Sequence, residues 1–371
     1  MGERGRRNGL RRSTIGDRKG ADAEGMEKLK TVIIGLGRIG WNFHLRECTG
    51  NRGFELAGVV DPLEDRRREA EETYNVASFP DTRELYRSIK PDLVVIASPT
   101  PFHLEQILEA FEHGADVFCD KPLTLTYQDA CRAAEAARNR NRKLMVYQPH
   151  RARPEVAALR DILSKGLIGD LVMIKRGVSS YVRRNDWQAF LKYGGGMLNN
   201  YGAHYIDQLL YLAESSARKV SCSLRNILSL GDAEDVVKAV IETESGVILD
   251  IDINMASAAR IEPWLILGKY GSVVYDSGEK CWRVSSTEAG KLKPAALSES
   301  LAARERAYPN DDVEWDIRNV PFSDYSGIDF YEECRGYFGG GKKPFVPIEE
   351  TLEVMRVIHL CREDAKTRGF V

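Results

Sequence analysis

Three features are scarce in this chain of 371 residues: paired cysteines, long apolar runs and an excess of charge of one sign. The seven cysteines are scattered and none lies in a Cys-x-x-Cys pair, which argues against a disulfide framework and against a zinc site. No apolar run approaches the roughly 18 residues of a membrane helix. The net charge of -2 provides no basic field for nucleic acid. We therefore expect a cytoplasmic protein with free thiols, no metal, no membrane segment and no nucleic-acid partner.

Residues 1–28 differ from the rest, because arginine and lysine crowd a segment with few apolar side chains. Two arginine pairs resemble the start of a twin-arginine export signal, but no apolar segment follows either pair, which excludes that interpretation. We expect a disordered tail here and a natural start at Met26. The remaining length exceeds what one hydrophobic core usually serves, which predicts two domains, over residues 29–150 and 151–371.

A glycine-rich turn follows the first apolar strand of the chain. Residues 31–34 predict a strand, after which the chain runs Gly-x-Gly-x-x-Gly up to Gly40. Residues 41–48 predict a helix and residues 54–60 a second strand, which ends at Asp61, about 20 residues beyond the last glycine. Glycines allow a tight turn and the close approach of a pyrophosphate, which sits at the N-terminus of the helix. This order of elements predicts a dinucleotide site.

Asp61 indicates which dinucleotide binds there. Its carboxylate can accept hydrogen bonds from both hydroxyls of an adenosine ribose and would repel a 2'-phosphate, which favours NAD over NADP. Arg66, Arg67 and Arg68 follow closely in the sequence and leave the exclusion of NADP open, although they also fit a solvated helix face.

Strands and helices continue to alternate up to about residue 150. We expect strands over residues 92–97, 116–119 and 143–147, and helices over residues 63–74, 82–89, 103–113 and 126–139. Fully apolar strands are typical of a parallel sheet covered on both faces, so we predict a doubly wound α/β sheet. Ligands bind such sheets at the carboxyl ends of the strands. The residues at those ends are Gly35, Asp61, Ser98, Asp120, Lys121 and Gln148.

Lys121 carries the most chemical information among these residues. A lysine just past a buried strand, in a cleft that holds a nicotinamide, has a lowered pKa and can relay protons. The alternative is a lysine that only steadies the cofactor by its charge. The residues alone leave both roles open.

The second half of the chain has a different pattern. A helix is expected over residues 155–165 and a strand over 171–178. From residue 219 strands predominate, over 220–228, 235–242, 247–255, 264–267 and 272–275. They predict a largely antiparallel sheet with helices over one face. The other face needs burial, so we expect a homo-dimer or homo-tetramer through this sheet. Residues 276–320 are polar and broken by glycine and proline, which predicts an irregular surface excursion. Helices are expected over 330–338 and 349–366.

Residues 194–207 lie between these patterns. Three glycines are followed by Asn199 and Asn200, which offer an N-cap, and then by a helical pattern. Asn200 and His204 lie one turn apart and share a face of this helix. The stretch is either a chemical site or a buried apolar stripe with a satisfied core histidine, and it leaves both interpretations open.

Several stretches together resemble the superfamily of glucose–fructose oxidoreductase, inositol dehydrogenase and rhizopine-catabolism proteins, often called Gfo/Idh/MocA. They are the glycine turn, Asp61, and residues 98–103, 120–122 and 194–207, in the family's order and at its spacing. The resemblance implies a Rossmann domain, then an α/β domain built on an open, mostly antiparallel sheet, and NAD as cofactor, with NADP less favoured. The expected cofactor contacts are Gly35, Gly37, Arg38, Ile39, Gly40, Asp61, Ser98, Thr100, His103, Asp120, Lys121 and Gln148.

The resemblance also implies catalytic roles. Lys121 matches the lysine of the family's Glu-Lys-Pro motif beside the nicotinamide, Asp120 replaces its glutamate, and His204 matches the usual general acid/base. Asn200 stands where the family commonly has aspartate. It brings no negative charge to stabilise an imidazolium, so base catalysis rests more on Lys121. Trp187 lies in the region that lines the family's substrate pocket and suits the apolar face of a sugar or cyclitol.

The expected reaction is the reversible, NAD-dependent oxidation of a secondary hydroxyl of a sugar, sugar derivative or inositol. Lys121, Asn200 and His204 are its expected catalytic residues, and these three and Trp187 its expected substrate contacts. Two alternatives stay open. Some relatives form a transient 3-keto sugar with bound NAD and then cleave a glycoside, without net NADH. Another relative binds dinucleotide, catalyses nothing and acts through protein contacts, a role that the missing charge at Asn200 would allow.

Overall fold

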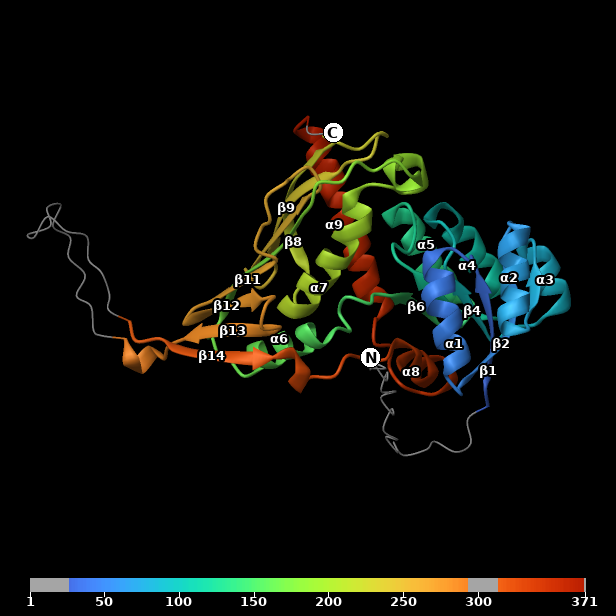
Figure 1. The fold of residues 1–371 in the computed structure, drawn as a ribbon, viewed down its shortest axis with the longest axis horizontal. Helices are drawn as coiled ribbons and strands as arrows, with labels where there is room; N and C mark the ends of the chain where they lie inside the picture. The colour runs from blue at the N-terminus through green and yellow to red at the C-terminus, as the bar shows by residue number, and fades with distance from the viewer. Residues whose placement is uncertain (1–26, 293–312, 370–371) are drawn as a thin grey trace, which may run out of the picture.

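A computed structural model describes residues 27–292 and 313–369. They form two β-sheets at opposite ends of the molecule, with helices α7 (Ala203–Ala213) and α9 (Ile348–Thr367) between them (Figure 1). The predicted tail lies almost entirely outside the described residues. The predicted α/β class, with one parallel and one mostly antiparallel sheet, is confirmed.

The first sheet is parallel and has the strand order β3-β2-β1-β4-β5-β6. Its strands are β1 (Leu29–Ile34), β2 (Phe54–Val60), β3 (Ala77–Phe79), β4 (Leu93–Ile96), β5 (Asp116–Asp120) and β6 (Leu144–Tyr147). The helices of this half are α1 (Arg46–Gly50), α2 (Glu64–Tyr74), α3 (Thr82–Ser88), α4 (His103–Glu112) and α5 (Tyr127–Asn139).

Both faces of the first sheet are buried, which explains its uninterrupted apolar strands. In β1, Val32 and Ile34 pack in one core cluster with Leu85 of α3 and Ile107 of α4. Ile33 points to the other face, into a second core cluster. Because neighbouring side chains of a strand face opposite sides of the sheet, the residues on both sides of these strands must be apolar.

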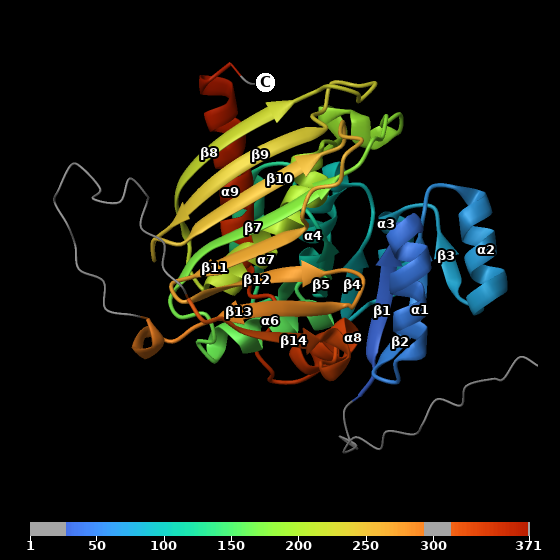
Figure 2. The same cartoon turned by 60° about the vertical axis from the view of Figure 1, so that its left-hand side comes forward.

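The second sheet has the order β14-β13-β12-β11-β7-β10-β9-β8, and within the described strands only β7 and β10 pair in parallel. Its strands are β7 (Leu171–Ser179), β8 (Ala217–Arg225), β9 (Val236–Thr243), β10 (Ile248–Asn254), β11 (Trp264–Gly268), β12 (Gly271–Asp276), β13 (Cys281–Ser286) and β14 (Asp316–Pro321). Helices α6 (Pro154–Ser164), α7 and α9 cover one face. Figure 2 shows the other face, over which the described chain places no helix.

The irregular excursion predicted over residues 276–320 is wrong in part, because β13 and β14 fall inside it. Trp282 of β13 is fully buried, and its indole N–H donates to the backbone oxygen of Glu155 at 2.7 Å. Strand β14 is mostly exposed, and within the described strands it pairs only with β13. Main-chain hydrogen bonds hold this strand, so its sequence does not show the alternation of apolar and polar residues that would have predicted it. Residues 293–312 lie outside the described chain.

The chain returns to the first sheet near its end. Helix α8 (Phe330–Cys334) and the π-helical turn that follows it place Phe330, Tyr331 and Phe338 in the second core cluster with Ile33 and Phe118. Residues 330–338 therefore pack on the N-terminal half, although they follow the second sheet in sequence.

Candidate active site

The glycine turn after β1 packs tightly against the backbone at Gly35 and Gly40 and faces open space at Gly37. Gly35 has φ +93°, and a Cβ there would lie 2.6 Å from the backbone nitrogen of Ser98. A Cβ on Gly40 would collide with the carbonyl of Gly35. At Gly37 no atom of the described chain lies within 4 Å of the Cβ position. Two glycines thus allow the close packing of the turn, and the third leaves open space against which a pyrophosphate fits.

Asp61 ties the end of β2 to this turn. The carboxylate is 2% exposed and accepts hydrogen bonds from the backbone N–H of Leu36 at 2.8 Å and of Leu63 at 3.0 Å. Arg66, about half exposed, forms an ion pair with the same carboxylate at 3.3 Å. A carboxylate oxygen accepts more than one hydrogen bond, so Asp61 retains capacity for ribose hydroxyls. Two cations therefore lie at the end of β2, because Arg67 also donates to the backbone oxygen of Asp61 at 2.9 Å.

His103 braces the turns at the ends of β4 and β5. Its Nε2 lies 2.8 Å from the oxygen of Ser98, and its Nδ1 lies 3.1 Å from the oxygens of Pro122 and Leu123. The ring is 1% exposed, so the surrounding carbonyls leave no ring nitrogen facing a ligand. His103 thus holds the turn that carries Lys121, and its contact with the cofactor stays a prediction. The neighbouring Thr100 is buried and faces the cavity described below.

Lys121 connects the two halves of the molecule. Its Nζ donates to the backbone oxygen of Asn200 at 2.8 Å. Burial, together with the charge of Arg38, lowers the pKa of Lys121 to about 8, against the opposing charge of Asp120. Asp120 is partly buried, and desolvation raises the pKa of its carboxyl, which accepts the Lys121 backbone N–H at 2.8 Å. The amine can therefore lose its proton near neutral pH.

Gln148, at the end of β6, has an unsatisfied polar atom. Its side chain is 2% exposed, and its Oε1 has no hydrogen-bond partner in the part of the chain that the structure describes. A buried polar atom without a partner is costly, and at the carboxyl end of a parallel strand a bound ligand can satisfy it. Together with the open side of Gly37, this atom fits a dinucleotide.

The glycine loop leads into a π-helical turn, Leu198–Gly202, and then into α7. The N-cap predicted at Asn199 and Asn200 is wrong. The carboxylate of Glu234 accepts the backbone N–H of Leu198 at 3.0 Å, while the Asn199 amide donates to the oxygen of Gly194 at 3.0 Å. A π-turn displaces the backbone from the regular helical pattern, and this one presents the carbonyl of Asn200 to Lys121.

Asn200 points its amide toward the cavity. Its Nδ2 lies 3.4 Å from Oε1 of Gln188, which also accepts a hydrogen bond from Arg184. A small cavity of about 40 Å³ brings several of the predicted residues together. It is lined by Thr100, Lys121, Pro122, Trp187, Gln188, Gly194, Gly195, Gly196, Asn199 and Asn200. Gln188 was not predicted, and only its position beside Trp187 hints at it.

His204 lies one turn after Asn200 and is 8% exposed. Its ring stacks on that of His150, with centroids 3.8 Å apart and planes 10° apart. Its Nδ1 has no hydrogen-bond partner within the described chain. Burial, and then the charges of Lys121, His150 and Arg153, hold the pKa of His204 well below its usual value. The ring is therefore neutral at pH 7 and can accept or donate a hydrogen bond.

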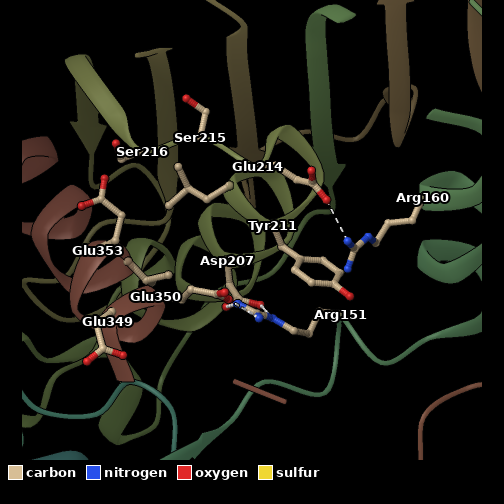
Figure 3. Close-up of a pocket in the computed structure, with 12 residues that line it drawn as sticks. Arg151, Arg160, Asp207, Tyr211, Glu214, Ser215, Ser216, Glu349, Glu350 and Glu353 are labelled. Atoms are coloured by element: carbon tan, nitrogen blue, oxygen red, sulfur yellow. Dashed lines mark hydrogen bonds and ion pairs between the residues drawn. The ribbon is translucent and has the colours of Figure 1, made fainter. Parts of the chain in front are cut away.

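Asp207 takes no part in this cavity. It is fully buried and paired with Arg151, whose Nε donates to Oδ2 of Asp207 at 2.9 Å, while a second nitrogen of Arg151 reaches Glu350 (Figure 3). These residues border a larger cavity of about 530 Å³ beside α7. None of the predicted site residues lines it.

Two further kinds of feature were sought over residues 27–292 and 313–369. This part of the chain gathers no three His, Cys, Asp or Glu side chains in a way that could hold a metal ion. It also has no helix with the length and apolar character needed to cross a membrane.

Comparison with known proteins identifies both halves. Residues 29–148 match the model described as "Oxidoreductase family, NAD-binding Rossmann fold", and residues 156–274 match the "GFO/IDH/MocA C-terminal domain". The chain is 28% identical over 188 residues to D-glucoside 3-dehydrogenase of Escherichia coli (strain K12), covering 50% of this chain and 54% of that protein. The match thus spans about half the length of that relative.

Two other similarities extend over nearly the whole chain. The uncharacterized oxidoreductase YdgJ of Escherichia coli (strain K12) is 24% identical over 92% of this chain and 98% of its own length. The crystal structure of an NAD-binding protein from Listeria innocua has the same fold, with TM-score 0.80, 24% identity and coverage of 92% of this chain and 99% of that one. The chain belongs to the Gfo/Idh/MocA family of oxidoreductases with an NAD-binding Rossmann fold.

Proposed function

We propose that the protein reversibly oxidises a secondary hydroxyl of a sugar, sugar derivative or inositol with NAD. The observation that carries the proposal is Lys121, an amine with a pKa of about 8 that lies between the dinucleotide turn and the helix of His204. An alcohol loses a proton from oxygen and a hydride from carbon. NAD, when bound, accepts the hydride. The protein must then supply a base beside the hydroxyl, and Lys121 has the pKa for that role.

The other side chains orient the hydroxyl. Asn200 presents a neutral amide to the cavity, and Oε1 of Gln188, which lines the same cavity, lies 3.4 Å from that amide. His204 stays neutral and offers one hydrogen bond to the alcohol. Because Asn200 carries no charge, no carboxylate on this turn raises the pKa of His204, which leaves the proton transfer to Lys121.

The substrate class rests on Trp187 and on the named relative. Trp187 is 45% exposed at the edge of the cavity, where an indole can pack on the apolar face of a pyranose or cyclitol ring. D-glucoside 3-dehydrogenase, to which half of the chain is similar, is named for a secondary hydroxyl of a glucoside.

We infer NAD rather than NADP from the buried carboxylate of Asp61. A 2'-phosphate would meet that charge at the end of β2, although Arg66 lies beside it. Steady-state kinetics with both coenzymes test this inference. NAD should give the larger kcat/KM, and Asp61→Ser should narrow the difference. A wild-type preference for NADP would contradict it.

We also propose that residues 29–150 bind the coenzyme and residues 151–371 bind substrate and assemble copies, with residues 330–338 packed back on the first sheet. Assembly would use the open face of the second sheet, where Val240 is 38% exposed beside the ion pair of Lys238 with Asp250. Light scattering should give the molar mass of a dimer or tetramer, and the substitution Val240→Glu should lower that mass. A monomeric mass for the wild type would exclude this assembly.

The proposed activity is tested with purified protein, NAD and a panel of glucosides, free sugars, sugar acids and inositols. Reduced coenzyme, seen as absorbance at 340 nm (roughly the nicotinamide band), should appear with at least one compound. Release of an aglycone without net reduction would favour glycoside cleavage through a keto sugar instead. Tight NAD binding with neither product would favour a regulatory role.

A further inference from the structure

His150 is a second histidine at the candidate site, and neither the motif nor its spacing points to it. It lies three residues after the end of β6, and its ring lies nearly parallel to that of His204, with centroids 3.8 Å apart and planes at 10°. Its Nδ1, like that of His204, has no hydrogen-bond partner among the described residues. Two histidines are thus stacked face to face beside Lys121.

The stack is held by the same helix that carries His204. The backbone oxygen of His150 accepts a hydrogen bond from Nε2 of Gln208 at 2.8 Å, and Gln208 lies one turn after His204 on α7. The next residue, Arg151, is paired with Asp207 of α7 (Figure 3). Both contacts fix the segment after β6 on α7, so the two rings cannot move independently.

The geometry excludes proton transfer between the rings. An imidazole donates and accepts hydrogen bonds in its own plane, and these two planes are nearly parallel. A proton on one ring therefore cannot pass directly to the other. What the stack does provide is a flat cover over one face of His204, which holds the ring and keeps water from that face.

The charges around both rings are positive. Lys121, after β5, and Arg153, before α6, act on both rings, and Arg176 of β7 acts on His150. Burial and these charges lower the pKa of His150 to about 3. The largest cause of the low pKa of His204 is burial, and the ring of His150 contributes to that burial. A neutral His204 thus depends on a covered face.

We propose that His150 is a positioning residue that holds His204 in its working orientation and keeps it neutral by covering one face of the ring. Its effect on rate rests on the proposed dehydrogenase function, whereas its effect on the charge of His204 does not. The variants that separate cover from chemistry are His150→Phe, which keeps a flat ring without nitrogens, and His150→Ala, which removes the cover.

The direct test is NMR of the histidine C–H signals as a function of pH, with the His204 signal assigned by its loss in His204→Gln. Between about pH 5.5 and 8 the His204 signal should not titrate in the wild type or in His150→Phe. It should titrate in His150→Ala with a midpoint below about 6.5, the value of a hydrated imidazole, because Lys121 and Arg153 stay in place and their charges still act on the ring. A flat signal in His150→Ala, or titration in His150→Phe, would overturn the proposal.

A matched control is available on the surface. His113 stacks on Tyr86 with centroids 4.1 Å apart and planes at 10°, so His113→Ala removes a similar stack far from this site. It should leave the His204 signal unchanged. If His150→Ala does not fold, as judged by melting, His150→Ser takes its place with the same expected titration.

Kinetics add the functional half of the test. Misplacement of a reacting group by about 1 Å costs up to roughly 10²-fold, so His150→Ala should lower kcat about 10–100-fold with KM within about 3-fold. A new acid limb near pH 6 should appear in its kcat/KM profile, roughly where free imidazole titrates. His150→Phe should recover most of the rate. Equal losses in both variants would overturn the positioning role, and no turnover in any variant would refute the proposed function while leaving the NMR result decisive.

Discussion

His103 and His204 are both buried histidines of the candidate site. They are 1% and 8% exposed, and burial lowers the pKa of both. Their hydrogen bonding differs. The nitrogens of His103 face carbonyls of Ser98, Pro122 and Leu123, whereas Nδ1 of His204 has no partner in the described chain.

We propose that this difference distinguishes a histidine that only supports the turn from one that has a nitrogen free for a ligand. A side chain whose polar atoms all face protein partners has nothing left for a substrate, and its removal costs stability. A buried nitrogen without a partner is expensive to maintain, and its presence beside a perturbed lysine indicates a ligand. If burial and a low pKa were the only criteria, both His103 and His204 would be candidate catalytic residues.

The largest expected effect falls on Lys121. Lys121→Met should lower kcat by about 10²–10⁴-fold, the usual contribution of a general base. Lys121→Arg is the matched control, because it keeps the charge but does not lose its proton near neutral pH. Rates of coenzyme reduction, with NAD binding measured by fluorescence, check the result. Near wild-type activity in Lys121→Arg would mean that the residue only steadies the coenzyme.

The second prediction concerns the two histidines directly. His204→Gln should lower kcat about 10–100-fold, the size of one hydrogen bond to a reacting group, and leave the melting temperature nearly unchanged. His103→Gln should do the reverse, costing about 1–3 kcal/mol of unfolding free energy with a smaller loss of rate. Urea unfolding and steady-state kinetics on both variants decide. If both variants lost kcat and unfolding free energy to the same extent, the proposed difference between the two histidines would be wrong.

The third prediction restores the missing charge at Asn200. Asn200→Asp places a carboxylate near Lys121 and His204, which favours their protonated forms. The pKa of Lys121 should rise from about 8, so the increase of kcat/KM with pH should move upward by about one unit. At pH 7 the rate should fall about 3–10-fold, because less Lys121 is unprotonated. An unchanged pH profile would show that Lys121 is not the titrating base.

The sequence predicted the local parts of this site because short patterns encode them. The glycine turn needs its residues within one strand and one helix, and Lys121 directly follows a buried strand. The π-helical turn and α7 begin where the glycines end. Each of these features depends on residues that are neighbours in sequence.

The parts that sequence missed depend on contacts between distant segments. Glu234 caps Leu198 across 36 positions, and His150 meets His204 only because the segment after β6 is held on α7. No period or spacing in the sequence encodes either contact. Strand β13 was missed for a related reason, since Trp282 is buried by α6 although its surroundings in sequence are polar.

The smallest expected effect is one in which the two histidines behave alike. Each has a folded pKa below its ordinary value of 6.5, so below that pH the unfolded chain binds protons that the folded chain does not. Their contribution to stability is complete above pH 6.5 and is lost as the pH falls toward the folded pKa. The loss is at most about 1.4 kcal/mol per pH unit for each group. Urea unfolding between about pH 7.5 and 5.5 should therefore show a shallower acid decline in both His103→Gln and His204→Gln than in the wild type. If the two variants show equal slopes of unfolding free energy against pH but unequal kcat values, then burial determines the titration of both histidines, whereas the unsatisfied nitrogen determines the effect on catalysis.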